Sequence, residues 1–148
     1  MINETEDGVQ KFAGYLRQAG VVTFLTGAGM STESGIPDFR STQGLYNSGI
    51  NEEIFDIRVF DRKPERFYQF AADFLGAIRI ARPHEGHLAI TRLRERFGKT
   101  VRVCTQNIDS LHQDAGNPDV MPVHGTLMSS HCRACGAAFS ADLVWEAI

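Results

Sequence analysis

Hydrophobic positions in the first third of the chain predict a helix, a strand and a loop. Apolar residues recur at helical spacing near the start, at Val9, Phe12, Ala13 and Leu16. Gly20 follows as a stop, so this pattern predicts a first amphipathic helix. The apolar, β-branched run VVTFLT at 21–26 favours a buried parallel strand. Residues 41–58 show no clear period and predict a loop or lid.

The rest of the chain alternates between helical and strand-like patterns. Pro64 stands where a helix would start, and a wide apolar stripe follows it at Phe67, Phe70, Ala71, Phe74, Leu75 and Ile78. The later elements are expected in the order helix, strand, short helix and short strand, at about 85–97, 100–106, 107–116 and 120–125. Strands that alternate with helices favour a parallel α/β sheet.

Polar clusters follow all three predicted strands. In chain order, they are Gly27-Ala28-Gly29, Gln106-Asn107-Ile108-Asp109 and His124-Gly125. In an open parallel sheet, ligands bind outside the carboxyl ends of the strands. We therefore expect the three clusters to form one shared site.

The first cluster has the chemistry of a phosphate-binding turn, with two alternatives left open. Glycines after a strand let the backbone approach a phosphate closely. Thr32 stands where the usual dinucleotide fingerprint has its third glycine, so a plain turn between strand and helix is an equal alternative. After Pro37, the trio Asp38-Phe39-Arg40 is suited to clamp a ligand. Alternatively, a buried Phe39 anchors the loop beside a surface Asp38–Arg40 pair.

Four motifs together resemble the sirtuins, the NAD-dependent protein deacylases. They occur in the order GAGMSTESGIPDFR, TQNIDSLH, HG and CRAC, and the likeness runs from about Val21 to Cys135. The run NEEIFDIRVF resembles deacetylases of bacteria and archaea. The resemblance implies an α/β fold whose first part, residues 1–126, is an incomplete Rossmann-like parallel sheet with helices. It also implies the first half of a small zinc-ribbon domain at 127–148.

The resemblance implies NAD as the cofactor and assigns a role to each site residue. The residues expected to bind NAD are Gly27, Ala28, Gly29, Ile36, Asp38, Phe39, Arg40, Gln106, Asn107, Ile108, Asp109 and His124. Asn107 and His124 are also expected to be catalytic, with His124 as the general base. A histidine near its free pKa takes up a proton readily at neutral pH. Without its neighbouring motifs, a lone histidine before a glycine is more often structural.

The implied reaction is the NAD-dependent removal of an acyl group, above all acetyl, from lysine in a peptide or protein. Its products would be nicotinamide, free lysine and O-acyl-ADP-ribose. Tyr68 matches the branch that removes succinyl and malonyl groups, but Ala71 replaces that branch's arginine. A buried acyl carboxylate would lack its charge partner, which favours an uncharged acyl group. The same motifs also fit NAD hydrolysis, ADP-ribosyl transfer, or a non-catalytic or partner-completed NAD-binding module.

Cys132 and Cys135 form a Cys-x-x-Cys pair that resembles the first arm of a structural zinc ribbon. A closed zinc site needs four ligands, and the family pattern continues with a second cysteine pair. We therefore expect the 148 residues to be a fragment with little activity alone. A helix with little to pack on is expected to begin around Phe139, Leu143, Val144 and Trp145. No catalytic role is assigned to His84, His87, His112, His131 or Cys104.

Composition adds mainly exclusions. The 148 residues suit about one domain, and 43% hydrophobic with 22% charged residues is ordinary for a globular protein. A net charge of -3 gives no reason to expect a nucleic-acid or membrane-surface partner. An acidic, polar N-terminus is unlike a secretory signal, and three cysteines do not make a disulfide framework. We expect a cytoplasmic protein, and the oligomeric state stays open.

Overall fold

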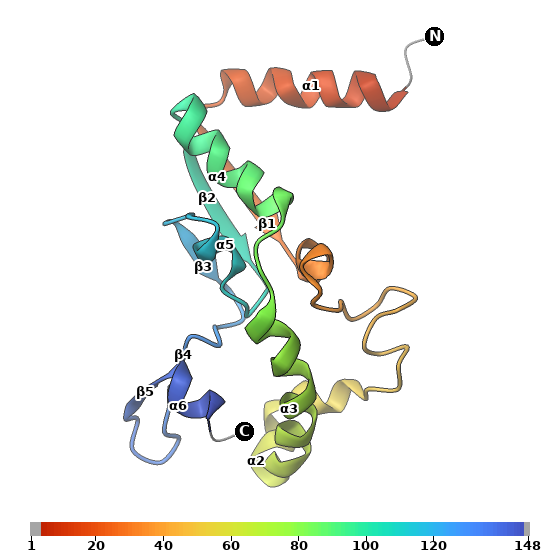
Figure 1. Ribbon diagram of the computed structural model, residues 1–148, viewed down its shortest axis with the longest axis vertical. Helices are drawn as coiled ribbons and strands as arrows, with labels where there is room; N and C mark the ends of the chain where they lie inside the picture. The colour runs from red at the N-terminus through yellow and green to blue at the C-terminus, as the bar shows by residue number, and fades with distance from the viewer. Residues whose placement is uncertain (1–3, 147–148) are drawn as a thin grey trace.

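A three-stranded parallel sheet forms the centre of the molecule (Figure 1). The computed structural model describes residues 4–146. The strands are β1 (Val21–Thr26), β2 (Thr100–Thr105) and β3 (Val120–Pro122), in the order β1-β2-β3. All six residues of β1 pair with β2, and β3 pairs with the second half of β2. Because the strands are parallel, their carboxyl ends meet at one edge of the sheet.

Helix α4 (Glu85–Phe97) packs on the sheet and makes the first core cluster. Ile90 of α4 lies against Val101 and Val103, which alternate with exposed residues along β2. Gly98 ends the helix with φ of 60°, a left-handed conformation that glycine adopts without strain. The chain then enters β2 directly, so this packing fixes where β2 ends.

The segment between β1 and α4 contains four helical elements. It contains the 3₁₀ helices η1 (Ala28–Ser34) and η2 (Glu52–Phe55) and the α-helices α2 (Ile57–Arg62) and α3 (Pro64–Ile80). A second core cluster joins the end of α3 to the loop after η1 and to α5 (Leu111–Asp114). Its members are Ile36, Ala81 and Leu111, with Phe74 and Ile78 packed against them.

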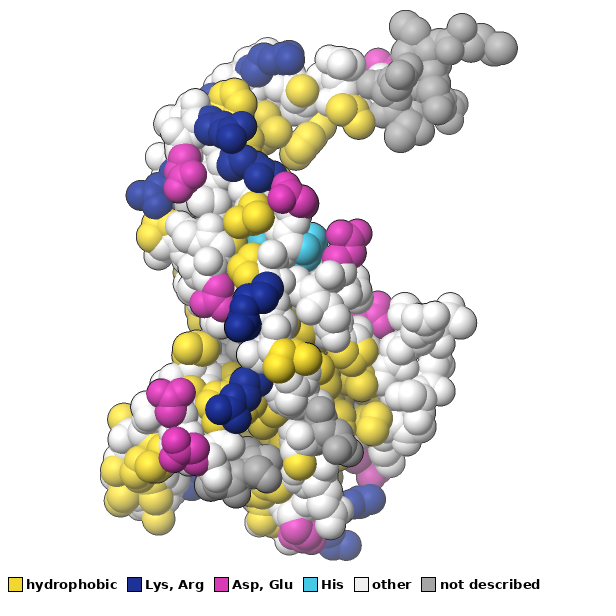
Figure 2. Space-filling view, in the orientation of Figure 1, with side chains coloured by type: hydrophobic (Ala, Val, Ile, Leu, Met, Phe, Trp, Pro, Cys, Tyr) yellow, Lys and Arg dark blue, Asp and Glu magenta, His cyan; other side chains and the backbone are white. Residues whose placement is uncertain are grey.

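The two ends of the described chain lie at opposite ends of the molecule (Figure 1). Helix α1 (Glu4–Gln18) stands apart from the sheet, and hydrophobic side chains gather on one of its sides (Figure 2). At the other end, β4 (Ser129–His131) pairs antiparallel with β5 (Ala138–Ser140), and α6 (Ala141–Trp145) follows. Arg133 ties this hairpin to α2 through an ion pair with Asp61 at 2.8 Å.

Most of the predicted elements are confirmed, and three predictions need correction. The strand at 21–26, the helices that start at Pro64 and Glu85, and the parallel sheet are all present. The strand at 21–26 is not buried as predicted, however, because in the part of the chain that the structure describes β1 has no neighbouring strand on its other side, and Val21 and Leu25 lie exposed. The predicted loop at 41–58 is irregular over residues 41–51, but it also contains η2 and the start of α2, which are too short to show an apolar period. Phe139 lies in β5 and not in the final helix, because β5 pairs with β4. Among the described residues, no helix is long and apolar enough to cross a membrane.

Candidate functional site

A cavity of about 630 Å³ opens at the carboxyl edge of the sheet. This volume is typical of sites for small molecules. Most of the predicted site residues line it together: Ala28, Gly29, Ile36, Asp38, Phe39, Arg40, Gln106, Asn107, Ile108, Asp109 and His124. Gly27 adjoins them at the end of β1, where a Cβ atom would lie 3.3 Å from Oε1 of Gln106. The structure thus brings the three strand-end clusters to one place.

Three buried polar side chains form the floor of this site. The Ser31 hydroxyl donates to Oδ2 of Asp109 at 2.8 Å and accepts from Nδ2 of Asn107 at 2.9 Å. The backbone N–H of Leu111 donates to Oδ1 of Asp109 at 3.1 Å. Ser31, Asn107 and Asp109 are each at most 9% exposed. Because burial makes an unpaired polar group costly, these bonds hold the side chains in one arrangement.

Ser31 is a site residue that the sequence analysis missed. It follows the glycine turn within GAGMST, a motif interpreted there through its glycines. Its partners Asn107 and Asp109 lie 76 and 78 residues further along the chain, so no local pattern marks the contact. The only sequence signal was a small polar residue in the turn between a strand and a helix, a position that the fold places inside the molecule. Tyr46, Phe55, Phe74 and Ile78 line the cavity as well and were also missed.

His124 lies exposed at the mouth of the cavity, oriented by the backbone of Gln106. Its Nδ1 is 3.1 Å from the Gln106 carbonyl oxygen. A carbonyl oxygen only accepts, so Nδ1 carries the hydrogen and Nε2 keeps its lone pair in neutral imidazole. The Gln106 N–H in turn donates to the carbonyl oxygen of Thr26 at 2.9 Å. This arrangement presents a proton acceptor at the end of β3.

The loop after Pro37 closes on itself through backbone bonds. The N–H groups of Leu45 and Tyr46 donate to the carbonyl oxygens of Asp38 and Phe39 at 2.8 and 3.1 Å. Gly44 is required inside the closed loop, since a Cβ atom there would lie 2.6 Å from the carbonyl carbon of Phe39.

The side chains of Asp38 and Arg40 have separate partners. The Asp38 carboxylate accepts from the hydroxyl of Ser41 at 2.6 Å, and the Arg40 guanidinium lies 5.6 Å from the centre of the Tyr46 ring. This geometry disfavours the alternative in which Asp38 and Arg40 pair at the surface. Phe39 packs among aromatic rings but is only half-buried, so the structure gives just part of the burial that the anchored-loop alternative expects.

A row of three imidazole rings lies behind the glycine turn. Ring centres are 4.6 Å apart from His84 to His87 and 4.8 Å apart from His87 to His112. His84 donates from Nε2 to the Met30 carbonyl oxygen at 2.6 Å, and His112 Nε2 lies 3.0 Å from Oγ1 of Thr26. Burial, and secondarily the two neighbouring histidines, lowers the pKa of His87 to about 4. His87 is therefore neutral at pH 7, and the row of rings joins α4, α5 and η1.

The Cys132–Cys135 turn lies away from the sheet, between β4 and β5. The Cys132 N–H donates to the Ala137 carbonyl, and Gly136 donates back to the Cys132 carbonyl, both at 2.8 Å. The backbone N–H groups of Cys135 and then Ala134, with a smaller contribution from the Cys135 thiol, lower the pKa of Cys132. A thiolate is the form that binds metals, so both thiols fit half of a zinc site. Within residues 4–146, no group of three or more potential metal ligands gathers.

The fold defines a Rossmann-like α/β protein with a cavity at the carboxyl edge of its sheet. Comparison with family models matches residues 27–148 to the Sir2 family. The chain therefore belongs to the Sir2 family.

Curated relatives carry the name NAD-dependent protein deacetylase. One from Geobacillus kaustophilus is 39% identical over 144 residues, which is 93% of this chain and 57% of the relative. Another, from Thermotoga maritima, is 37% identical over 134 residues, covering 90% of this chain and 54% of the relative. The chain thus spans little more than half the length of these relatives.

Solved structures of Sir2 enzymes share the fold. A structure on the mechanism and regulation of Sir2 enzymes has a TM-score of 0.85 and 37% identity, covering 96% of this chain and 56% of that one. A Sir2 complex with a p53 peptide and NAD⁺ has a TM-score of 0.80 and 35% identity, covering 93% and 54%. The likeness thus extends over nearly all of this chain.

Proposed function

We propose that this chain forms the NAD-binding part of an NAD-dependent protein-lysine deacetylase. The observation that carries the proposal is the convergence of three strand ends on one cavity, with the Ser31–Asn107–Asp109 cluster as its floor. The names of the curated relatives and the NAD⁺ complex of a similar Sir2 enzyme support the choice of cofactor.

Each edge of the cavity suits one part of NAD. The glycines at 27 and 29 let the backbone come close to the pyrophosphate. Asn107 and Asp109 present amide and carboxylate groups where a nicotinamide carboxamide would be held. Asp109 keeps acceptor capacity beyond its two present hydrogen bonds, because each carboxylate oxygen has two lone pairs. Bound NAD would supply the ribose carbon that exchanges nicotinamide for the acyl-lysine oxygen.

His124 is proposed as the general base and Asn107 as a second catalytic residue. The Nε2 lone pair of His124 would accept the proton of a ribose hydroxyl, while Nδ1 stays bonded to the Gln106 carbonyl. Asn107 is held by Ser31 and by a bond from its own N–H to Oγ1 of Thr105 at 3.0 Å. A fixed amide can orient the reacting groups with little loss of entropy.

An acetyl or other uncharged acyl group is the proposed target. Ala71 is fully buried in α3 and offers no cation to an acyl carboxylate, while Tyr68 is 45% exposed. The cavity wall formed by α3, η2 and the loop after Pro37 is aromatic and suits an apolar acyl group.

Cys132 and Cys135 are proposed as two ligands of a structural zinc ion. The lowered pKa of Cys132 favours the thiolate, which is the form that binds zinc. We also propose a division into an NAD-binding part at 1–126 and a zinc-binding part at 127–148. The free cysteines fit a reducing, cytoplasmic location.

Calorimetric titration with NAD tests the proposal most directly. The chain should bind NAD, and Asn107→Ala should weaken binding at least about tenfold, because the amide and its bond to Ser31 are lost. Gln113→Ala removes an exposed amide on α5 and serves as the matched control. A chain that binds no NAD, or equal weakening by both variants, would contradict the assignment.

Incubation with NAD and an acetyl-lysine peptide separates the alternative activities. The expected outcome for the 148 residues alone is NAD binding with little turnover. Consumption of NAD without peptide would instead favour NAD hydrolysis or ADP-ribosyl transfer. Robust peptide deacetylation, lost in His124→Ala while NAD binding stays, would show that the described site suffices for the reaction.

A further inference from the structure

A row of aromatic rings runs from α3 to the closed loop at 38–46 beside the cavity. Ring centres are 5.1 Å apart from Phe74 to Phe70, 5.3 Å from Phe70 to Phe55 and 5.4 Å from Phe55 to Phe39. Tyr46 completes the row at 5.5 Å from Phe39. The last two rings belong to the closed loop at 38–46, whereas the first two belong to α3.

Phe55 is the link between these two parts. Its ring meets Phe39 at 85° and Phe70 at 86°, both edge-to-face contacts. Aromatic pairs in this geometry contribute stabilisation beyond the burial of their surface. Phe55 is still 40% exposed and lines the cavity, so its role in the core is limited.

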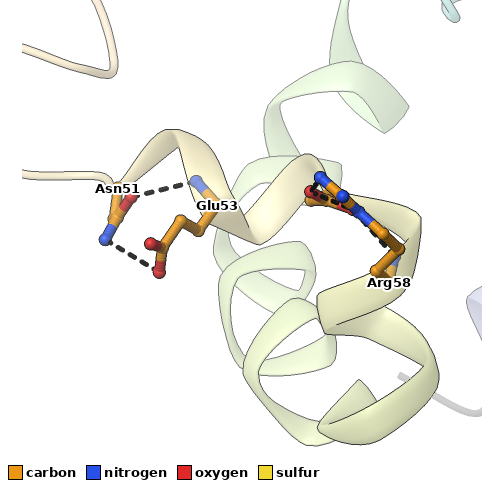
Figure 3. A network of polar contacts seen from close by, with 4 residues as sticks. Asn51, Glu53 and Arg58 are labelled. Atoms are coloured by element: carbon orange, nitrogen blue, oxygen red, sulfur yellow. Dashed lines mark hydrogen bonds and ion pairs between the residues drawn. The ribbon is translucent and has the colours of Figure 1, made fainter.

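Two helix caps hold the backbone of Phe55 on both sides (Figure 3). Asn51 Oδ1 accepts from the Glu53 N–H at 2.9 Å and starts η2. Asp56 Oδ1 accepts from the Arg58 N–H at 2.8 Å and starts α2, and the Asp56 carboxylate also pairs with the Arg58 guanidinium at 2.6 Å. Phe55 is the last residue of η2, directly before the second cap. Its ring is therefore presented from a defined backbone position.

The α3 end of the row is anchored in the core. Phe70 and Phe74 stack at an interplanar angle of 20°, and Phe74 packs against the cluster of Ile36, Ala81 and Leu111. The other side of the Phe55 ring is held by α3. A displacement of Phe39 would therefore break the contact between the Phe39 and Phe55 rings.

We propose that Phe55 is a positioning residue that holds Phe39, and with it the closed loop at 38–46, against the candidate cofactor cavity. The expected effect on NAD binding rests on the proposed function, whereas the role of Phe55 in holding the loop does not. Phe55 acts through Phe39, so its loss opens the loop without removing the polar floor of the site.

The test compares three variants of the 148-residue chain. Phe55→Leu keeps an apolar side chain but removes the edge-to-face contacts. Phe55→Tyr keeps the ring, and its hydroxyl can reach solvent because the site is partly exposed. Phe67→Leu is the matched control, since the Phe67 ring pairs with Phe60 and Tyr68 at 5.5 and 5.9 Å, outside the row.

Hydrogen exchange of the ligand-free chain reports on the loop directly. The probes are the amides of Leu45 and Tyr46, which donate across the loop. Both should exchange about tenfold faster in Phe55→Leu and near the wild-type rate in Phe55→Tyr and Phe67→Leu. Unchanged exchange in Phe55→Leu, or equal acceleration in Phe67→Leu, overturns the proposal. If Phe55→Leu fails to fold, Phe55→Met is measured against the same criteria.

Titration with NAD adds a second readout that separates the two proposals. Phe55→Leu should weaken NAD binding about tenfold, and Phe55→Tyr should restore it. If the wild-type chain binds no NAD, the proposed function fails while the exchange rates still decide the role of Phe55. If NAD binds equally to wild type and Phe55→Leu, the positioning role is overturned and the NAD assignment stands.

Discussion

The floor of the cavity and the cysteine turn differ in how many of the contacts that each needs come from the described chain. Ser31, Asn107 and Asp109 come from two strand ends, are buried, and bond to one another. Cys132 and Cys135 come from one short turn, with Cys135 exposed and Cys132 half-buried. The first group needs the sheet to exist, whereas the second needs only the local backbone of residues 132–137.

This difference separates what the fold stabilises from what a ligand would have to stabilise. The buried cluster has its hydrogen bonds within the chain, so its geometry is set before any ligand binds. The cysteine turn lowers the pKa of Cys132 through local N–H groups but gathers no third or fourth metal ligand within residues 4–146. The two regions should therefore respond differently to mutation, acid and metal removal.

The largest effect is expected from Asp109→Ala. The change leaves the Ser31 hydroxyl and the Leu111 N–H without their buried acceptor. Unfolding in urea should show a loss of about 3 kcal/mol. Asp114→Ala is a matched control, because Asp114 also accepts from a serine hydroxyl at 2.8 Å but lies exposed. A loss as small as that of the control, about 0.5 kcal/mol, would place the cluster outside the stabilising core.

The sequence predicted the helices that have a continuous hydrophobic period. It also predicted the contacts between residues that stand at the ends of neighbouring strands. Helices α3 and α4 have long apolar stripes, and the strand-end residues share an edge because the strands are parallel. It did not predict η2 or α2, which depend on the side-chain caps Asn51 and Asp56 and not on a hydrophobic period. Ser31 was missed for a different reason, since its partners lie far along the chain.

Acid should destabilise the parallel sheet and the helices packed on it through His87. Its pKa is about 4 in the folded chain and about 6.5 when unfolded, so the unfolded state binds more protons between these values. The stabilisation is present above pH 6.5 and is lost as pH falls toward 4. Between pH 7 and pH 5 the unfolding free energy should drop by about 2 kcal/mol from this group.

Urea unfolding of His87→Leu at several pH values checks this contribution. The variant should have a shallower acid slope, with part of the slope left because burial also lowers the pKa of His112. His131→Leu, which removes an exposed histidine on β4, should keep the wild-type slope. An unchanged slope in His87→Leu would mean that His87 takes up a proton in the folded chain and contributes nothing to the acid dependence of stability.

A smaller effect is expected from the caps beside the aromatic row. Asn51→Ala removes the acceptor for the Glu53 N–H and should cost about 1 kcal/mol of local stability. Asn51→Asp keeps an acceptor at the same position and should restore it. Hydrogen exchange across residues 52–55 measures both variants. Equal exchange in all three proteins would show that packing of Phe55, and not the cap, holds η2.

The smallest effect on the fold is expected from Cys132→Ser. Cys132 lies on the exposed hairpin, so without metal the unfolding free energy should stay within about 0.5 kcal/mol of wild type. Zinc should bind the wild-type thiols and not the variant, and a chelator should leave the stability of the sheet unchanged. A spectroscopic thiolate–metal titration, paired with urea unfolding, tests both parts. If Cys132→Ser or chelation weakened the sheet as much as Asp109→Ala does, the cysteine turn would be coupled to the cavity floor, and the Arg133–Asp61 ion pair would be the first contact to remove in search of that coupling.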